Sequence, residues 1–198
     1  MLLQQNRSRQ FSAPTSKVAL IAVFTALSLG TNYLMIDVPN VKLMDSLVFI
    51  SAFLFGLDVG VATGTSIWLV YGFVNPYGQD SPLLLLFLIA GESFYAIAGA
   101  LLKRTSAATQ LLRDGNYRYA TIVFGGLGLV TTFAYDALTN FGDKLPFTNS
   151  PYEAFLIGMI TGAPFALFHE LSNIAFFATI VPAALYATRR LRLGVDHN

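Results

Sequence analysis

Cysteine is absent from this sequence of 198 residues, and histidine occurs only twice. The lack of cysteine excludes disulfide bonds, thiolate metal sites and a cysteine nucleophile. His169 begins a His-Glu-Leu-Ser-Asn segment that resembles the start of a zinc-protease motif, but the required second histidine is missing. There is also no Gly-x-Ser-x-Gly elbow and no Walker motif. We therefore expect no enzyme, metal site or cofactor, and any use of ATP would need a partner protein.

Charge is also scarce. Only 12% of the residues are charged, whereas 55% are hydrophobic, and a soluble domain usually carries about 25% charged residues. The mean hydropathy of +0.59 points the same way. No polar stretch is long enough to form a separate soluble core. The composition therefore predicts a single integral membrane domain over residues 1–198, with the lipid bilayer as its surroundings and no nucleic-acid partner.

Long apolar runs dominate the chain, and a membrane-spanning helix needs roughly 20 apolar residues. The first run is longer than a typical signal-peptide core and has no clear cleavage site after it, so we interpret it as a retained span. The apolar blocks are Val18–Ile36, Ser46–Val74, Leu83–Leu102, Ala120–Phe141 and Ala154–Thr188.

Ten of the twelve Lys and Arg residues fall into three clusters, and cytoplasmic segments are enriched in such residues. An even number of crossings must therefore separate the clusters. Both termini are predicted to be cytoplasmic, with tails over about residues 1–16 and 189–198. The clusters are Arg7, Arg9 and Lys17; Lys103, Arg104, Arg113 and Arg118; and Arg189, Arg190 and Arg192.

Two apolar blocks are too long for one simple span. The block Ser46–Val74 is interpreted as a hairpin that turns at Gly56-Leu57-Asp58, with a short first arm over Val41–Leu57; a re-entrant loop is the alternative. In the last block we expect a short helix, Tyr152–Thr161, and a break near Gly162-Ala163-Pro164 before the final span. Whether that short helix is re-entrant or part of the last span is left open. The prediction is an all-α bundle of six transmembrane helices.

Several spans carry polar residues at helical spacing, and a charge in mid-bilayer costs about 3 kcal/mol or more. Such residues face a partner, a cavity or the protein interior. This pattern favours a pocket for a small, partly polar ligand, although hydrogen bonds that only join the helices are the alternative. The stripes are Glu92 with Tyr95; Thr132, Asp136 and Asn140; His169 with Asn173; and Trp68, Tyr71 and Asn75.

Small residues allow helices to approach closely in lipid. Ala19, Ala22, Ala26 and Gly30 form one smooth face of the first span, which would suit either internal packing or a partner protein. Gly56, Gly60 and Gly64 repeat every four residues and are interpreted as internal packing.

Taken with these features, four segments resemble the substrate-binding S component of an energy-coupling factor (ECF) vitamin transporter. Ala22-x-x-x-Ala26 resembles the motif with which such proteins dock on a transmembrane coupling subunit, and Phe53–Gly64 resembles a Gly-rich turn between the second and third helices. Tyr135–Asn140 and Phe168–Asn173 resemble segments of the fifth and sixth helices. The size and the six-span layout also match the family.

The resemblance implies a high-affinity subunit of the plasma membrane that captures a vitamin or vitamin precursor. It would dock on a coupling subunit driven by two ATPases. The chain lacks the N-terminal Met-His of cobalt and nickel members, so a bare metal substrate is not expected. A cobalamin-type or other vitamin cargo is compatible with the sequence. The implied pocket comprises Tyr95, Asp136, Asn140, His169 and Asn173, with Glu92 deeper and Val38–Lys42 as a lid.

A ligand-free membrane scaffold is the competing hypothesis. It predicts polar stripes that pair with one another and leave no cavity. Neither the substrate nor the choice between a shared and a dedicated coupling module follows from the sequence.

Overall fold

The computed structural model describes residues 14–194, apart from residues 77, 107–109 and 112–114. The basic residues Arg7, Arg9 and Arg113, residues 1–13 of the N-terminal tail and residues 195–198 of the C-terminal tail lie outside the described residues. The described part of the chain consists of helices and the loops that join them, and it contains no strand. In chain order the elements are α2 (Pro14–Leu34), α3 (Met44–Phe55), α4 (Leu57–Val74), α5 (Pro82–Lys103), α7 (Tyr117–Lys144), the 3-10 turn η1 (Leu145–Phe147) and α8 (Pro151–Gly194).

Among the described residues, five helices are long and apolar enough to cross a membrane, and α3 is a shorter apolar helix. Helices suit a bilayer because they satisfy their backbone hydrogen bonds internally. Two of these helices begin at a polar N-cap residue. The Ser81 side chain accepts a hydrogen bond from Leu84 N at the start of α5, and the Asn116 side chain accepts one from Tyr119 N at the start of α7.

The predicted hairpin turn lies where the sequence placed it. Gly56 separates α3 from α4 with φ 115°, a backbone conformation that favours glycine. Lys17 of α2 pairs with Asp58 beside this turn, and the Asp58 side chain stays largely exposed. The first arm of the hairpin is Met44–Phe55, shorter than the expected Val41–Leu57.

Helix α3 is the central element of the bundle. Its 12 residues span only about 18 Å at 1.5 Å per residue, and the ten from Met44 to Phe53 are all buried. Helices α2, α4, α5 and α8 all pack against it. A helix that is apolar on every side is usually buried in this way. Asp45, in the first turn of α3, is also completely buried, although a carboxylate at the start of a helix is usually exposed.

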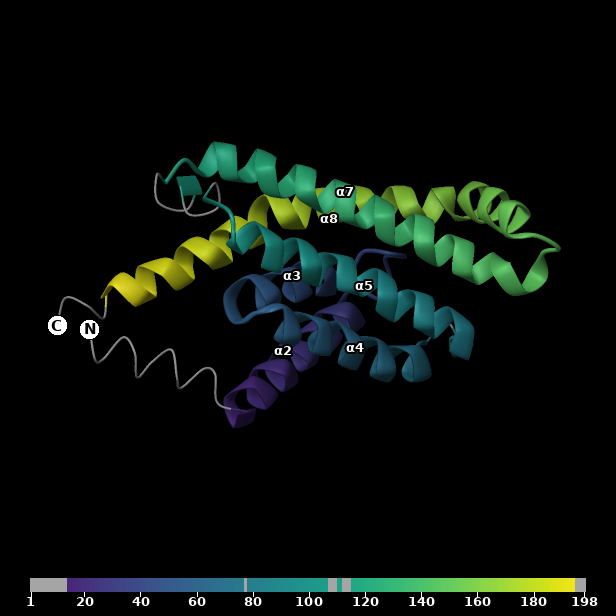
Figure 1. Cartoon of the computed structure of the whole chain (residues 1–198), viewed down its shortest axis with the longest axis horizontal. Helices are drawn as coiled ribbons and strands as arrows, with labels where there is room; N and C mark the ends of the chain where they lie inside the picture. Colours follow the sequence, from purple (N-terminus) through teal and green to yellow (C-terminus); the bar gives the residue numbers. More distant parts are fainter. Residues whose placement is uncertain (1–13, 77, 107–109, 112–114, 195–198) are drawn as a thin grey trace.

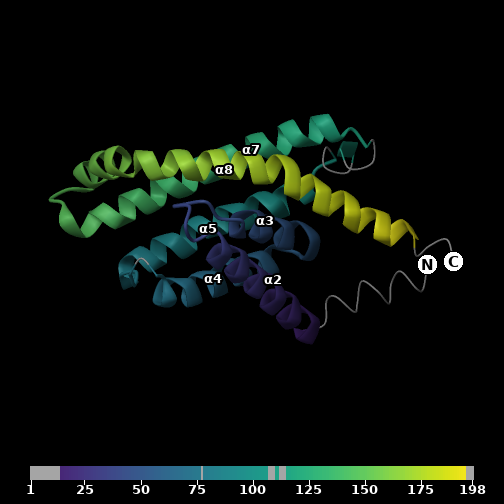
Figure 2. The ribbon, with the colours of Figure 1, turned by 180° about the vertical axis from the view of Figure 1, so that it is seen from behind.

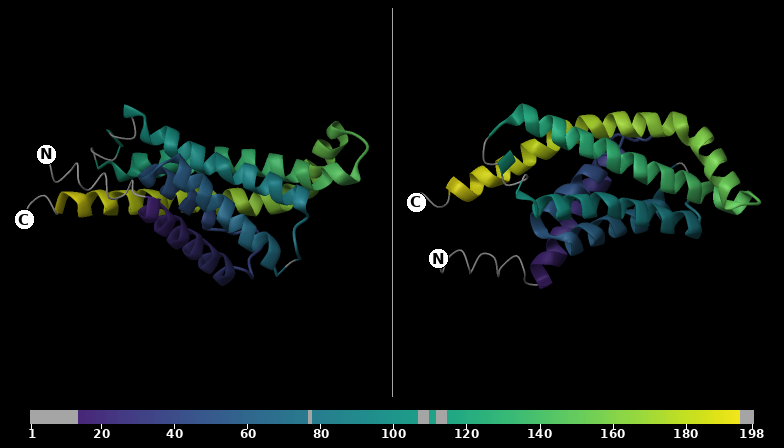
Figure 3. Two further views of the ribbon diagram at one scale, coloured as in Figure 1. Left: turned by 60° about the horizontal axis from the view of Figure 1, so that its bottom comes forward. Right: turned by 45° about the horizontal axis from the view of Figure 1, so that its top comes forward.

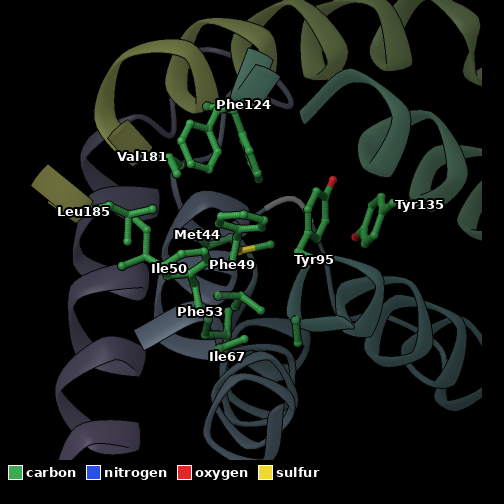
Figure 4. Packing of buried hydrophobic residues seen from close by; sticks show 14 of the residues in the cluster. Met44, Phe49, Ile50, Phe53, Ile67, Tyr95, Phe124, Tyr135, Val181 and Leu185 are labelled. Carbon is green, nitrogen blue, oxygen red and sulfur yellow. The ribbon is translucent and has the colours of Figure 1, made fainter. Parts of the chain in front are cut away.

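Figure 4 shows the core around α3. The Phe49 ring lies 5.2 Å from that of Phe177 of α8 and 6.0 Å from that of Phe124 of α7, both in edge-on contact. Edge-to-face packing is a favoured arrangement of aromatic rings. The Tyr95 and Tyr135 rings stand side by side at the edge of this cluster, where their centroids are 5.9 Å apart.

Helices α7 and α8 form a long antiparallel pair that runs beside the other helices (Figures 1 and 2). The expected break near Gly162-Ala163-Pro164 is wrong, because α8 is one continuous helix of 44 residues. The helix bends along its length, but its helical turns continue without interruption (Figure 3). Pro164 and Pro182 lie inside it, and proline is the usual cause of a sharp helix bend.

The two sets of small residues have different surroundings. A Cβ added to Gly60 would lie 2.5 Å from the Ala52 Cβ of α3, and one added to Gly64 would lie 2.7 Å from the Glu92 Cγ of α5. Internal packing is therefore confirmed for Gly60 and Gly64, whereas Gly56 forms the turn between α3 and α4. By contrast, the stripe of the first span is exposed at all four positions, Ala19, Ala22, Ala26 and Gly30.

Candidate functional site

A histidine held between two carboxylates lies in the interior of the bundle. His169 of α8 places Nδ1 2.8 Å from Asp136 Oδ1 of α7 and Nε2 2.7 Å from Asp45 Oδ2 of α3. All three side chains are almost completely buried. Only a ring that carries both protons donates to both carboxylates; a neutral ring donates to one. The protonation state of His169 therefore determines whether α8 donates hydrogen bonds to both α3 and α7 or to only one of them.

Asn173, one turn further along α8, extends this network. Its Nδ2 donates to Asp45 Oδ2 at 2.6 Å and to Thr132 Oγ1 at 2.9 Å. The Tyr95 hydroxyl of α5 donates to the same Thr132 oxygen at 3.1 Å. We call these residues, with His169 and Asp136, the His169 network. It joins α3, α5, α7 and α8.

The His169 network does not have the geometry of a metal site. Its two carboxylates contact opposite nitrogens of one ring, so they do not converge on a common point as metal ligands do. No group of three potential ligands suited to a metal occurs among the described residues.

A second buried pair lies between α4 and α5. Trp68 Nε1 donates to Glu92 Oε2 at 3.0 Å, and both side chains are buried. The absence of a side chain at Gly64 makes room for Glu92. In the described part of the chain, one oxygen each of Glu92, Asp45 and Asp136 has no hydrogen-bond partner.

A cavity of about 380 Å³ opens next to these polar groups. Its wall is formed by the end of α2, the loop before α3, the end of α4, the start of α5 and Phe165 of α8. This volume falls in the range of small-molecule pockets, roughly 300 to 1,000 Å³. The polar residues of the wall are Asn32, Asn40, Lys42, Asn75 and Asp80.

A cation lies over the aromatic part of this wall. Lys42 Nζ is 4.9 Å from the centre of the Trp68 ring and 5.8 Å from that of Tyr71. Both distances are within the reach of a cation–π interaction, about 6 Å. Asp80, in the loop between α4 and α5, is half-buried. Burial raises the pKa of the Asp80 carboxyl, and the nearby Lys42 charge partly offsets this effect.

Asn32 is the most deeply buried polar residue of the cavity wall. Asn32 is only 2% exposed. Neither the nitrogen nor the oxygen of its side-chain amide has a hydrogen-bond partner in the described part of the chain. Because an unpaired buried amide costs free energy, such a group is well suited to bind a ligand.

The loop that closes the cavity is fixed to α8. Asn40 has a left-handed backbone, with φ 57°, and its Nδ2 donates to the carbonyl oxygen of Phe165 at 3.2 Å. Val41 N also donates to Val38 O at 3.3 Å within the loop. The segment Val38–Lys42, interpreted from the sequence as a lid, thus forms part of the cavity wall.

The predicted pocket residues divide into three groups. Trp68 and Asn75 line the cavity. Asn140 lies apart, between α7 and α8, where its side chain packs against Gly162. The remaining five are buried in hydrogen-bonded groups beside the cavity and do not line it: Glu92, Tyr95, Asp136, His169 and Asn173.

Sequence reasoning did not select Asn32, Asp45 or Asp80 as site residues, and it included Lys42 only as the end of the lid Val38–Lys42. Asn32 interrupts the first apolar run, so the search for polar residues within spans would have found it. Asp45 precedes an apolar block by one residue, a position equally typical of an exposed helix start. Lys42 and Asp80 lie in loops, where a charged residue gives no signal.

Comparison of this chain with protein-family models, curated proteins and solved structures finds no significant match.

Proposed function

We propose that this chain is the substrate-capture subunit of an ECF-type importer for a vitamin or a similar micronutrient. The observation that carries the proposal is the cavity of about 380 Å³, with an unpartnered buried amide in its wall. A protein that only holds a complex together gains nothing from leaving such a group unpaired.

The distribution of charge supports an outward-facing cavity. The start of α2, the end of α5, the start of α7 and the end of α8 lie at one end of the bundle (Figure 1). These helix ends carry the described members of the basic clusters, among them Lys17, Lys103, Arg118 and Arg189. By the positive-inside rule this end is cytoplasmic. With α3 as the sixth crossing, both termini are inside and the cavity opens outward at the plasma membrane.

The exposed small-residue face of α2 supports docking on a transmembrane coupling subunit. The residues Ala19, Ala22, Ala26 and Gly30 leave a smooth surface, and a Cβ added to Gly30 would meet nothing within 4 Å. Small residues allow close contact between helices in lipid. In this proposal two ATPases bound to the coupling subunit supply the energy.

The ligand-free scaffold remains the second candidate, because one observation favours it. Most polar groups of the His169 network pair with one another, as a purely structural network would. The scaffold does not account for the cavity beside the network.

A binding experiment separates the two candidates. The purified protein in lipid nanodiscs is screened by thermal shift against vitamins and their precursors, and any hit is verified by native mass spectrometry. Leu84→Trp, which fills the cavity, should abolish binding, whereas the exposed control Leu86→Trp on the same helix should not. A protein that binds no micronutrient, or binds equally well with the cavity filled, contradicts the capture function.

Docking requires a separate test. Ala22→Leu with Ala26→Leu should preserve ligand binding but abolish uptake and co-purification with the coupling subunit. The matched control is Ala90→Leu with Ala134→Leu, two exposed alanines of α5 and α7. Equal loss of binding and uptake in a folded Ala22/Ala26 variant, or the same loss of uptake in the control, refutes the docking role.

A further inference from the structure

We infer that the cavity binds a small organic anion with a single carboxylate, which faces Lys42, and with an N–H-bearing body that lies against Trp68 and Tyr71 and hydrogen bonds to Asn32. The inference names the substrate class of the proposed capture subunit and therefore rests on that function.

Lys42 supplies the charge argument. In the described part of the chain no carboxylate forms an ion pair with its ammonium group, which lies over two aromatic rings instead. Ring faces stabilise a cation but do not neutralise it. A ligand carboxylate that entered the cavity would find this cation already positioned, in surroundings less polar than water, where a charge-assisted hydrogen bond is strong.

The rest of the wall limits the ligand to one negative charge. Lys42 is the only cationic side chain of the described wall, and the Asp80 carboxyl lies in the same wall. A phosphate ester carries about 1.5 to 2 negative charges near neutral pH, and arginine is the residue that binds phosphate most specifically. One lysine close to an acidic residue fits a monocarboxylate better.

Asn32 and Asp80 specify the body of the ligand. The Asn32 amide offers a free donor and a free acceptor, and Oδ2 of Asp80 is a buried acceptor without a partner. Together they present two acceptors and one donor. An amide, urea or lactam edge, with its N–H and C=O side by side, satisfies the Asn32 pair. The inference therefore requires at least one N–H group on the ligand.

The volume limits the size of the ligand. About 380 Å³ lies near the lower end of the range for small-molecule pockets. It suits a body of one or two rings with a short acid chain. A tetrapyrrole-type macrocycle of the kind found in cobalamin is too large to be enclosed.

The test uses the full-length protein in nanodiscs and matched probes. The acids are indole-3-acetate, biotin and pantothenate, each compared with its neutral primary amide; tryptamine is the cationic probe. At least one acid should bind, and its amide should bind about tenfold more weakly or worse. Lys42→Met should weaken the acid by about tenfold or more and change the affinity of the amide by less than about twofold.

Lys17→Met is the matched control, because Lys17 lies near the start of α2, at the opposite end of that helix from Asn32, and pairs with Asp58. It removes one positive charge from a position that does not line the cavity, so it should leave the affinity of the acid unchanged. Variants are first shown to be folded by size-exclusion chromatography and by their melting temperatures. If Lys42→Met does not fold, Lys42→Gln replaces it, since it keeps a donor and loses the charge.

Three results overturn the inference: none of the acids binds, acid and amide bind equally, or Lys42→Met leaves the affinity of the acid unchanged. If a neutral or cationic micronutrient binds and Leu84→Trp blocks it, the carboxylate assignment fails while the capture function stands. If no compound of the complete vitamin screen binds, the capture function itself fails.

Discussion

Replacing His169 by leucine tests the energetic role of the buried network. Leucine fills a similar volume but donates no hydrogen bond, so the variant leaves Asp45 and Asp136 buried without the partner that lies 2.7 and 2.8 Å away. Two ordinary interhelical hydrogen bonds in a membrane protein are together worth about 1.2 kcal/mol, at roughly 0.6 kcal/mol each. Removing one partner of a buried ion pair costs more, about 3 to 5 kcal/mol.

The measured loss of stability therefore tells whether His169 and the two carboxylates form a buried ion pair or only ordinary hydrogen bonds. We expect His169→Leu to lower the free energy of unfolding by about 3 to 5 kcal/mol, because both carboxylates lose the His169 donor and only Asp45 keeps another, from Asn173. Reversible unfolding in mixed detergent and SDS micelles measures this quantity. Glu170→Gln is the matched control: it lies next to His169 in α8, is only half-buried, and should change the stability by about 0.5 kcal/mol or less.

A second substitution strengthens the test. Adding Asp136→Leu to His169→Leu removes the Asp136 carboxylate that has lost its His169 donor, so the double variant should recover part of the lost stability. A loss of about 1 kcal/mol or less for His169→Leu, or a further loss in the double variant, would show that the three residues do not form the charged network inferred from the structure.

Three further predictions concern single positions. Gly99→Ala would place a Cβ 2.4 Å from a backbone oxygen of α3 and should lower the free energy of unfolding by about 1 to 3 kcal/mol. In the same unfolding assay the control Gly126→Ala, whose Cβ would meet nothing within 4 Å, should leave the stability unchanged or raise it. Trp68→Phe removes the donor to the Glu92 carboxylate and should lower stability by about 1 to 3 kcal/mol; an unchanged value would refute that hydrogen bond. Because the pKa of Asp80 is raised, this carboxyl gains its proton at a higher pH than an ordinary aspartate, so mild acidification removes a negative charge from the cavity wall. The affinity for a carboxylate ligand should then rise as pH falls from neutral toward that pKa, and Asp80→Asn should abolish the rise in a binding titration.

The sequence alone determined the helical character, the positions of the long spans and the turn at Gly56. The bilayer explains this success: it requires long apolar runs and internally satisfied backbone groups, and both leave a clear mark on the sequence. The turn followed from a glycine between two apolar arms. The continuity of α8 did not follow, because Pro164 is compatible with either a break or a bend.

Only the tertiary structure decided which polar groups are paired and which face a cavity. The spacing of His169 and Asn173 indicated that they share a face of α8, but their partner Asp45 is 124 residues away from His169 in the sequence. The cavity is likewise built from four helices and two loops. Helical periodicity shows which way a side chain points, whereas the presence of an atom or an empty space in front of it depends on how distant segments pack.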